Sequence, residues 1–323
     1  MLNDINKNHF ESCREVKWCP GCGNYSILTT MQKTLHSIGL STKDVVFISG
    51  IGCSGRFPYY INTYGFHTLH GRAPAVATGL KLARPDLSVW LVIGDGDGFS
   101  IGLGHILHLF RRNIDINILF INNGIYALTK GQYSPTSNNN SITKSSPFGS
   151  IEKPINPINL ALNVGCSFVA RTIDNDFKNF KDIIIAAIKH KGTSFIEVLQ
   201  NCNIFNNNIY YNLTNKETKD EKILYLNNDK PLIYGKKNKY CLTINKQLEF
   251  TSIDYNNINT NNIIHHTINN KNIIQDMLSN ITYNDTPYPI GIFRSINTMT
   301  YDDIYQLKIK KSKKINTFSD IFC

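Results

Sequence analysis

Short apolar segments alternate with stretches of helical spacing through the first two thirds of the chain. The apolar runs have the length of buried strands, and we predict five of them, at 45–49, 88–93, 116–121, 166–172 and 194–200. Apolar residues that recur three and four positions apart predict helices, at 23–39, 73–83, 99–113 and 177–191. Strands that alternate with helices predict a doubly wound α/β fold with a mainly parallel sheet.

Two stretches interrupt this alternation. Residues 129–158 are rich in Gly, Ser, Thr, Asn and Pro, which predicts a long loop. Residues 201–290 are rich in Asn, but apolar residues stay interleaved, so we interpret the bias as compositional drift rather than as a prion-like segment. We expect residues 1–210 to form a ligand-binding α/β domain. Residues 211–323 are expected to form a less regular extension that packs on this domain or on a partner subunit.

Two polar motifs follow directly on predicted strands. GDGDG occupies 94–98 after one strand, and Asn122-Asn123 ends the next one. Because the carboxyl ends of parallel strands line the ligand crevice of an open sheet, we expect the two motifs to lie together. Gly-Asp-Gly alone is most often a turn, but an Asn pair at a second strand end favours a ligand site. A dinucleotide-binding fingerprint is excluded, since Phe99 stands where its third glycine would be.

The two motifs offer oxygen ligands of the kind that Mg²⁺ prefers. Asp95 and Asn123 supply side-chain oxygens, and the backbone carbonyl of Ile125 can add a third. Magnesium binds few protein oxygens and completes its octahedron with phosphates and water. Gly94 and Gly96 would let an anion approach the backbone closely. The sequence therefore predicts a site for Mg²⁺ and a diphosphate.

Four of the eight cysteines have the placement of metal ligands. Cys19 and Cys22 form a C-x-x-C, while Cys53 and Cys202 each follow a predicted strand. Four thiolates suit either Zn²⁺ or a [4Fe–4S] cluster, and one pair with two distant single cysteines is less typical of structural zinc. Free thiols are the remaining alternative. The other cysteines match no ligand position, and they are Cys13, Cys166, Cys241 and Cys323.

The formal net charge is +10, from 34 Lys and Arg against 24 Asp and Glu. These cations are dispersed, and we interpret the one dense run, at 308–314, as a solvated tail. Positive charge suits a diphosphate, a dicarboxylate or an acidic electron carrier as well as a nucleic acid, so charge does not choose among them. No apolar run approaches the roughly 20 residues that span a membrane. The polar N-terminal segment does not resemble a signal peptide, so we expect a cytoplasmic protein that binds no membrane.

The motifs and their flanking residues resemble the β subunit of 2-oxoacid:ferredoxin oxidoreductases, most densely over residues 15–210. The similar segments are WCPGCGN (18–24), GIGCSGR (50–56), TYGFHTLHGRAPAVATGLKLARPD (63–86), GDGDGFSIGLGHILHLFRRNIDINILFINN (94–123), ALTKGQYSPTS (127–137) and PYPIGIFR (288–295). The similarity is greatest to the 2-oxoglutarate branch. It implies a thiamine diphosphate-binding fold whose domain 1–210 carries thiamine diphosphate, Mg²⁺ and a [4Fe–4S] cluster.

The resemblance also implies roles for individual residues. It assigns Cys19, Cys22, Cys53 and Cys202 to the [4Fe–4S] cluster. Asn206 matches a family Asn near the diphosphate, in a run of Asn residues that leaves the register open. The residues expected to bind thiamine diphosphate are Ile51, Gly52, Cys53, Ser54, His70, Gly94, Gly96, Asp97, Ala127, Leu128, Asn206 and Asn207.

Three residues are expected to act in catalysis. Arg56 offers a planar fork that suits the distal carboxylate of a dicarboxylic 2-oxoacid, and its alternative role is a salt bridge that holds the cysteine loop. Lys130 is expected to orient the substrate or to close the cofactor pocket. The family pattern places His70 in that pocket, where an imidazole can hydrogen-bond a diphosphate or a reacting carbonyl.

An expected residue is missing from the cofactor region. In thiamine enzymes a carboxylate, typically of a Glu, bonds the pyrimidine N1′ atom, yet no Glu occurs between Val16 and Ile151. We therefore expect a second polypeptide, similar to the family's α subunit, to supply the pyrimidine half of the site. The isolated chain should then be catalytically silent. If the acid does lie in this chain, Glu197 in a predicted strand is the first candidate.

The expected reaction is the CoA-linked oxidative decarboxylation of 2-oxoglutarate to succinyl-CoA and CO₂, with ferredoxin as the electron acceptor. Pyruvate or a broad range of 2-oxoacids is the alternative substrate. A non-oxidative thiamine enzyme would leave the four cysteines without a role. A basic Cys₄-zinc module that binds nucleic acid would leave GDGDG and the Asn pair unexplained, so we expect no nucleic-acid partner.

Overall fold

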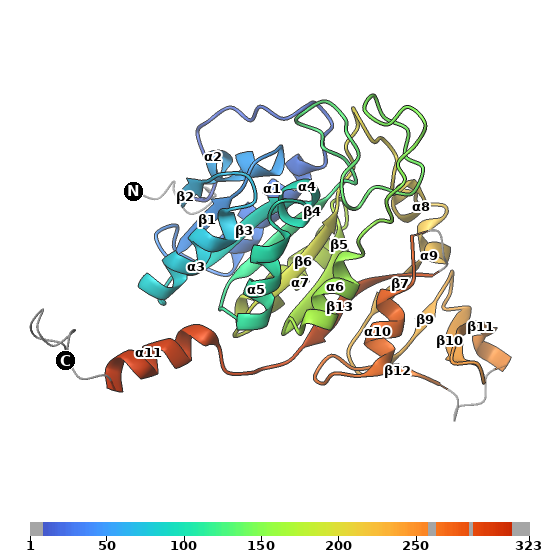
Figure 1. The fold of residues 1–323 in the computed structure, drawn as a ribbon. Helices are drawn as coiled ribbons and strands as arrows, with labels where there is room; N and C mark the ends of the chain where they lie inside the picture. Colours follow the sequence, from blue (N-terminus) through green and yellow to red (C-terminus); the bar gives the residue numbers. More distant parts are fainter. Residues whose placement is uncertain (1–8, 258–262, 284–286, 312–323) are drawn as a thin grey trace, which may run out of the picture.

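The computed structural model describes residues 9–257, 263–283 and 287–311, and its main body is a sheet between two layers of helices (Figure 1). Residues 312–314 of the basic run 308–314 lie outside the described residues, as does Cys323. Within the described ranges, no helix combines the length and the apolar character that crossing a membrane requires.

The main sheet has eight strands in the order β2-β1-β3-β4-β6-β5-β13-β7. The first six are mutually parallel, while β13 runs antiparallel to β5 and parallel to β7. The predicted, mainly parallel α/β sheet is therefore confirmed. Its strands are β1 (Val45–Ser49), β2 (Tyr64–His67), β3 (Ser88–Gly94), β4 (Asn117–Asn122), β5 (Phe168–Ile173), β6 (Ser194–Leu199), β7 (Ile223–Leu226) and β13 (Tyr288–Ser295).

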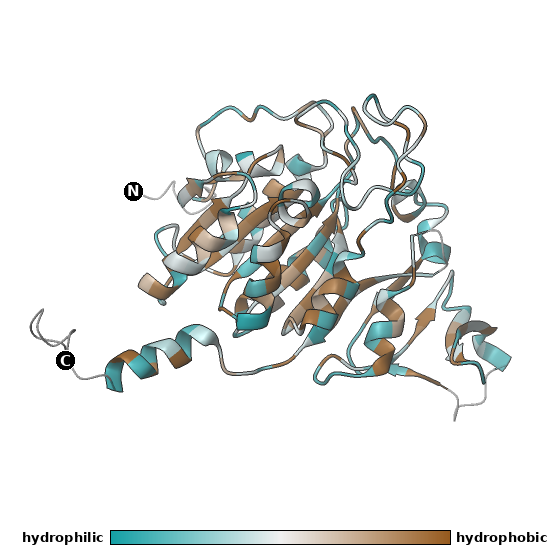
Figure 2. Cartoon of the chain, in the orientation of Figure 1, coloured by the Kyte–Doolittle hydropathy of each residue, from teal (hydrophilic) through white to brown (hydrophobic). Residues whose placement is uncertain are grey.

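Two hydrophobic clusters fill the spaces between the sheet and its two helical layers. One face of the sheet packs against α1 and α7, and the other packs against α3, α5 and α6. Figure 2 shows hydrophobic strands at the centre and hydrophilic positions on the outer helices. The helices of this body are α1 (Asn24–Ser37), α2 (Phe57–Tyr60), α3 (Ala73–Ala83), α4 (Asp95–Phe99), α5 (Leu103–Arg112), α6 (Pro157–Val164) and α7 (Phe177–Lys189), with a short 3₁₀ turn η1 at Ser54–Arg56.

Two local predictions needed correction. The single helix predicted over 99–113 is interrupted, so that α4 ends at Phe99 and α5 begins at Leu103. A Cβ at Gly102 would lie 2.5 Å from the Asp97 carbonyl oxygen, so the turn between the two helices requires a glycine at this position. The edge strand β2 was not predicted, because its residues YGFH contain a glycine and form no apolar run, and all four strand residues are exposed.

The C-terminal third contributes to the main sheet as well as forming smaller elements. Strands β7 and β13 extend the sheet beyond β5. The main sheet therefore contains strands from both sides of the expected domain boundary at residue 210. Two small sheets lie beside the body, with the orders β11-β10-β9 and β12-β8 (Figure 1). The remaining elements are α8 (Tyr211–Thr214), α9 (Lys219–Lys222), β8 (Lys230–Pro231), β9 (Ile233–Tyr234), β10 (Tyr240–Ile244), β11 (Phe250–Asp254), η2 (Tyr255–Asn257), β12 (His265–His266), α10 (Ile273–Ser279) and α11 (Tyr301–Lys311).

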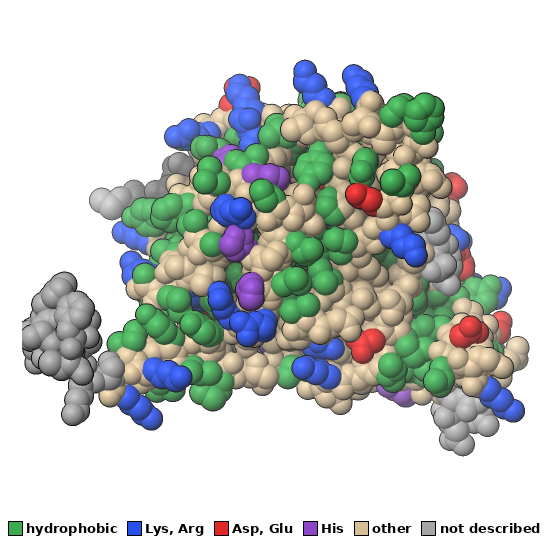
Figure 3. Space-filling view, viewed as in Figure 1, with side chains coloured by type: hydrophobic (Ala, Val, Ile, Leu, Met, Phe, Trp, Pro, Cys, Tyr) green, Lys and Arg blue, Asp and Glu red, His purple; other side chains and the backbone are tan. Residues whose placement is uncertain are grey.

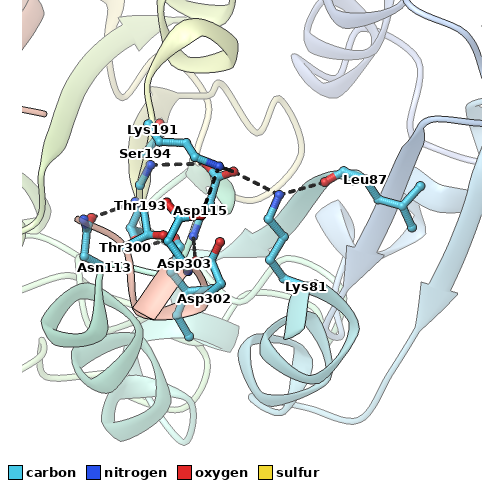
Figure 4. Close-up of polar contacts among 12 residues, drawn as sticks. Lys81, Leu87, Asn113, Asp115, Lys191, Thr193, Ser194, Thr300, Asp302 and Asp303 are labelled. Carbon is cyan, nitrogen blue, oxygen red and sulfur yellow. Dashed lines mark hydrogen bonds and ion pairs between the residues drawn. The ribbon is translucent and has the colours of Figure 1, made fainter. Parts of the chain in front are cut away.

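A polar cluster ties α3 and α11 to the amino-terminal edge of the sheet (Figure 4). Lys81, only 4% exposed, lies 2.9 Å from the Asp115 carboxylate. Burial acts to raise the pKa of Asp115, but the charge and hydrogen bond of Lys81, the Gly192 amide and the charge of Lys191 together outweigh burial and hold that pKa below its usual value. At the start of α11, Asp302 accepts a hydrogen bond from the Asp115 amide at 3.0 Å. The cluster lies at the end of the strands opposite to the polar motifs.

Candidate active site

The carboxyl edge of the parallel strands brings the polar motifs around one cavity of about 310 Å³. GDGDG begins at the end of β3, the Asn pair closes β4, and His70 follows β2. Of the residues expected to hold thiamine diphosphate and Mg²⁺, all but Asn206 and Asn207 line this cavity. They are Ile51, Gly52, Cys53, Ser54, His70, Gly94, Asp95, Gly96, Asp97, Asn123, Ile125, Ala127 and Leu128.

Asp95 is buried at the floor of this cavity and is held by two hydroxyls from the long loop. Ser134 and Thr136 both donate to its Oδ2 atom, Thr136 from 2.8 Å. Burial raises the pKa of Asp95, while these hydroxyl bonds act in the opposite direction. A buried carboxylate with one oxygen fixed by hydroxyls is well suited to a cation, which would supply the missing positive charge.

The neighbouring loop holds the Asn123 amide in a defined orientation. Its Nδ2 atom donates to Gln200 Oε1 at 3.0 Å, and its Oδ1 atom accepts the Ile125 amide at 3.2 Å. Asn206 lies behind this loop, where its side chain donates to the Asn123 carbonyl at 2.9 Å. The oxygen set of Asp95, Asn123 and Ile125 therefore shares one cavity and fits Mg²⁺ chemically.

Asp97 joins two walls of the cavity. Its Oδ1 atom accepts hydrogen bonds from the Ile51 amide at 3.0 Å and the Gly71 amide at 2.8 Å, and lies 2.8 Å from His70 Nδ1. Its Oδ2 atom is buried and has no hydrogen-bond partner among the described residues. Gly50 must be a glycine, since a Cβ there would lie 1.8 Å from that oxygen. Asp97 thus fixes the cavity's shape as well as lining it.

The four predicted ligand cysteines line a second cavity, of about 270 Å³. Cys19 and Cys22 come from the turn before α1, Cys53 from the loop after β1, and Cys202 from the loop after β6. The two cavities share part of their walls, formed by Asn24, Cys53, Asn123, Ala127 and Leu128. A redox centre held by these cysteines would therefore lie next to the predicted diphosphate site.

Two thiols of this cavity, those of Cys22 and Cys53, need a positive partner to ionise near neutral pH. Burial raises the pKa of Cys22 to about 12 and that of Cys53 to about 11, and the other thiols of the group add to both shifts. Within the described ranges, no group of three or more His, Cys, Asp or Glu side chains is arranged to hold a metal ion. Four thiolates are a donor set that an iron–sulfur cluster or zinc can use.

Arg56 and Lys130 both line the cysteine cavity. Arg56 Nε donates to the Tyr60 hydroxyl at 2.9 Å, which positions the guanidinium without neutralising it. Lys130 is exposed and adopts a positive φ of 75°, so its backbone makes a tight turn beside the cavity. Asn207 is exposed and accepts a hydrogen bond from Asn201 at 3.1 Å, away from both cavities.

Glu197 lies in the interior of β6 and does not line the cofactor cavity. Its Oε2 atom is 2.6 Å from Arg171 Nε, and both side chains are 1% exposed. Its Oε1 atom accepts a hydrogen bond from Asn122 at 2.8 Å. Asn122 in turn accepts from Thr136, the same hydroxyl that contacts Asp95. Glu197 therefore acts on the cavity indirectly: it holds Asn122, which binds the Thr136 hydroxyl that contacts Asp95.

Sequence patterns did not reveal several residues of the site. Ser134 and Thr136 belong to the long loop, which carries no periodicity that could place them against Asp95. Gln200 is the last residue of the strand predicted at 194–200, and that position at the carboxyl edge was the available signal. The cavity residues that were not predicted are Asn24, Ile121, Tyr126 and Thr129.

The fold and this cavity define a thiamine diphosphate-binding domain. Residues 50–198 match the family described as thiamine pyrophosphate enzyme, C-terminal TPP binding domain. The chain is 45% identical over 299 residues to the 2-oxoglutarate oxidoreductase subunit KorB of Mycobacterium tuberculosis, a match that covers 91% of this chain and 79% of that relative. It is 48% identical over 214 residues to the 2-oxoacid:ferredoxin oxidoreductase subunit beta of Saccharolobus solfataricus, covering 66% of this chain and 68% of the relative.

A solved structure extends the similarity to the whole chain. The 2-oxoglutarate:ferredoxin oxidoreductase of Magnetococcus marinus, with 2-oxoglutarate, coenzyme A and succinyl-CoA bound, superposes with a TM-score of 0.75 at 28% identity, over 98% of this chain and 95% of that one. The chain belongs to the family of 2-oxoacid:ferredoxin oxidoreductase β subunits. It is thus a subunit of an oxidoreductase, as the sequence motifs predicted.

Proposed function

We propose that this chain is the β subunit of a 2-oxoglutarate:ferredoxin oxidoreductase that works with thiamine diphosphate, Mg²⁺, a [4Fe–4S] cluster and CoA. The carrying observation is the wall that the two cavities share, because it puts a cysteine set beside a diphosphate-type site. Oxidative decarboxylation without a nicotinamide needs a one-electron acceptor close to the thiamine cofactor. A non-oxidative thiamine enzyme would have no use for the second cavity.

In this proposal, Asp95, Asn123 and the Ile125 carbonyl hold Mg²⁺, which in turn holds the diphosphate. When bound, thiamine diphosphate supplies the carbon nucleophile for decarboxylation. The chain's own residues orient the groups that meet the cofactor. Asp97 contacts the Nδ1 atom of His70 and so fixes the imidazole ring, which leaves the Nε2 atom of His70 available for the diphosphate or the substrate.

Cys19, Cys22, Cys53 and Cys202 are proposed to hold the cluster. Its proximity to the cofactor would allow electrons to leave singly toward ferredoxin. Buried thiols with raised pKa values favour the proposal, since bound iron would supply the positive charge that the four thiolates need.

Arg56 is proposed to recognise the distal carboxylate of the substrate. Its guanidinium borders the cysteine cavity and is oriented by a neutral partner, Tyr60. The name of the Mycobacterium relative and the ligands bound in the Magnetococcus structure point to 2-oxoglutarate over pyruvate. Lys130, from the turn that borders the same cavity, is proposed to orient the substrate.

A partner subunit is proposed to complete the site with the activating Glu. Large apolar side chains are exposed at or near residues of the cavity: Leu128, which lines it, is 51% exposed, Leu69, next to His70, is 74% exposed, and Ile101, beside Gly71, is 53% exposed. Such surfaces are typical of protein interfaces. On the face shown in Figure 3, Lys and Arg are scattered among other side chains rather than gathered in a stripe, which does not favour nucleic acid. A cytoplasmic location stays a prediction.

The proposal is tested with the complex purified without oxygen. We expect a brown sample that bleaches with dithionite, and CoA-dependent reduction of a viologen dye with 2-oxoglutarate exceeding that with pyruvate. A colourless, iron-free complex would contradict the cluster. Equal rates across a panel of 2-oxoacids would favour a broad-range enzyme instead.

A further inference from the structure

Gln200 lines the cysteine cavity and bonds to one proposed ligand of each centre, Asn123 and Cys22. It follows β6 directly and is 1% exposed. Its Oε1 atom accepts a hydrogen bond from Asn123 Nδ2 at 3.0 Å, and its Nε2 atom donates to Cys22 Sγ at 3.4 Å and to the Asn201 carbonyl. Every polar function of the amide is therefore used, so its orientation is fixed.

The first bond decides which end of the Asn123 amide faces the diphosphate cavity. An amide oxygen can bind Mg²⁺, whereas an amide nitrogen cannot. Because Gln200 holds the nitrogen, Oδ1 is directed to the other side, where it also accepts the Ile125 amide. Without Gln200, the bond from the Ile125 amide alone would hold this orientation of the Asn123 side chain.

The second bond acts on the proposed cluster. A hydrogen bond to a cluster thiolate stabilises the more negative, reduced state and so raises the reduction potential. In the part of the chain that the structure describes, Cys22 is the one proposed ligand whose sulfur accepts a hydrogen bond from a side chain. Gln200 therefore favours electron transfer into the cluster.

The backbone around Gln200 is held as firmly as its side chain. Its amide donates to the Asn122 carbonyl at 2.9 Å, which joins it to the end of β4. On the other side, a Cβ at Gly23 would lie 3.0 Å from Gln200 Cγ, so the cysteine turn packs directly on the side chain. The loop that carries Gln200 therefore cannot shift to replace either side-chain hydrogen bond, the one with Asn123 or the one with Cys22.

We propose that Gln200 is a positioning residue shared by the two centres: it presents the Asn123 oxygen to Mg²⁺ and tunes the cluster through Cys22. The proposal rests on the proposed function. It adds one residue that both orients a proposed Mg²⁺ ligand and adjusts the reduction potential of the proposed cluster.

The test uses Gln200→Leu and Gln200→Glu in the assembled, anaerobically purified enzyme. The cluster midpoint potential is measured by a dye-mediated titration followed by electron paramagnetic resonance, and the Mg²⁺ dependence of thiamine diphosphate binding is measured by calorimetry. Gln200→Leu should raise the Mg²⁺ concentration required by roughly tenfold, the effect of one hydrogen bond. Its potential should become more negative by about 59 mV if the one-electron equilibrium shifts tenfold.

Gln200→Glu separates the two roles. A carboxyl group accepts from Asn123 Nδ2 in either protonation state, so this variant should keep the wild-type Mg²⁺ response. Gln32→Leu is the matched control, since Gln32 is a buried glutamine whose Nε2 donates to two backbone carbonyls and which borders neither cavity. Neither readout should move in this control.

An unchanged potential or an unchanged Mg²⁺ response in Gln200→Leu, at full iron content, would overturn the proposal. So would a Mg²⁺ response in Gln200→Glu as weak as that of the Leu variant. If the Leu variant does not fold, Gln200→Met, unbranched and of similar length, takes its place. A wild-type complex without iron would instead overturn the proposed function and leave the geometry of Gln200 unaffected.

Discussion

His70 Nδ1 lies 2.8 Å from the Oδ1 atom of Asp97, a carboxylate that is 1% exposed. The same oxygen accepts the amides of Ile51 and Gly71, so one buried atom positions the ring and both adjoining loops. This contact fixes the orientation of the His70 ring, and His70 lines the cavity.

His70→Ala should therefore lower turnover by about 100-fold, the low end for loss of a group that transfers or polarises a proton. The fold should be retained, because 41% of the His70 side chain is exposed. Steady-state kinetics with saturating cofactor measure the effect. His108→Ala, an exposed histidine on α5 outside both cavities, is the control and should keep full activity.

Thr136 bonds both Asp95 Oδ2 and Asn122 Oδ1, each at 2.8 Å, and so links the proposed Mg²⁺ ligand to the Glu197–Arg171 pair. Thr136→Val keeps the shape of the side chain but removes this link. We expect weaker Mg²⁺-dependent thiamine diphosphate binding, by roughly 10-fold, as for a hydrogen bond to a charged group. Thr136→Ser retains the hydroxyl and should behave as wild type in calorimetry; a loss in Thr136→Ser as large as that in Thr136→Val would contradict the prediction.

Arg56→Ala tests substrate recognition. A charge-assisted pair with a carboxylate contributes roughly 1.5–3 kcal/mol, so KM for 2-oxoglutarate should rise by at least tenfold while KM for pyruvate changes little. If both KM values rise together, Arg56 instead supports the loop through Tyr60. Tyr60→Phe distinguishes these roles, since it removes the bond to Arg56 Nε and leaves the positive charge.

Lys81→Met should affect stability without affecting catalysis. It leaves Asp115, 20% exposed, without its closest cation, and losing one partner of a largely buried pair costs about 3 kcal/mol. Asp115 precedes β4 and so lies at the amino-terminal edge of the sheet, opposite the cavities, and the activity of each folded molecule should be unchanged. Denaturant unfolding measures the loss, and Lys191→Met, which removes the more exposed cation of the same cluster, should cost much less.

The sheet and the cavity were predictable because their signals are local. Apolar runs marked β1, β3, β4, β5 and β6, and polar residues just beyond those strands had to meet at one edge. That rule brought Asp95, Asn123, Cys53 and Cys202 to one edge without any knowledge of side-chain contacts. Cys19 and Cys22 precede the first helix, and the family resemblance grouped them with the other two cysteines.

Contacts that depend on irregular backbone could not be predicted in this way. Thr136 reaches Asp95 from a loop whose path follows no period, and the break before α5 depends on how closely Gly71 and Gly102 approach. The place of β13 was equally hidden, since its pairing with β5 joins residues more than a hundred positions apart.

The last prediction concerns the acid that the site lacks. Glu197 was the candidate within this chain, but its two oxygens are engaged by Arg171 and Asn122, and it does not line the cofactor cavity. Moving it to the cofactor would leave Arg171, 1% exposed, as an unpaired buried cation, at a cost of about 3–5 kcal/mol. We therefore expect the isolated chain to bind thiamine diphosphate and Mg²⁺ without activating it.

Hydrogen–deuterium exchange at C2 of the bound cofactor, followed by nuclear magnetic resonance, is the direct measurement. Exchange should be slow with the chain alone and become fast when the partner subunit is added. Fast exchange by the isolated chain would show that the activating carboxylate is present here after all. In that case Glu197→Gln should abolish fast exchange. If this variant retains fast exchange, the next candidate is Asp97, a buried carboxylate that contacts the His70 ring.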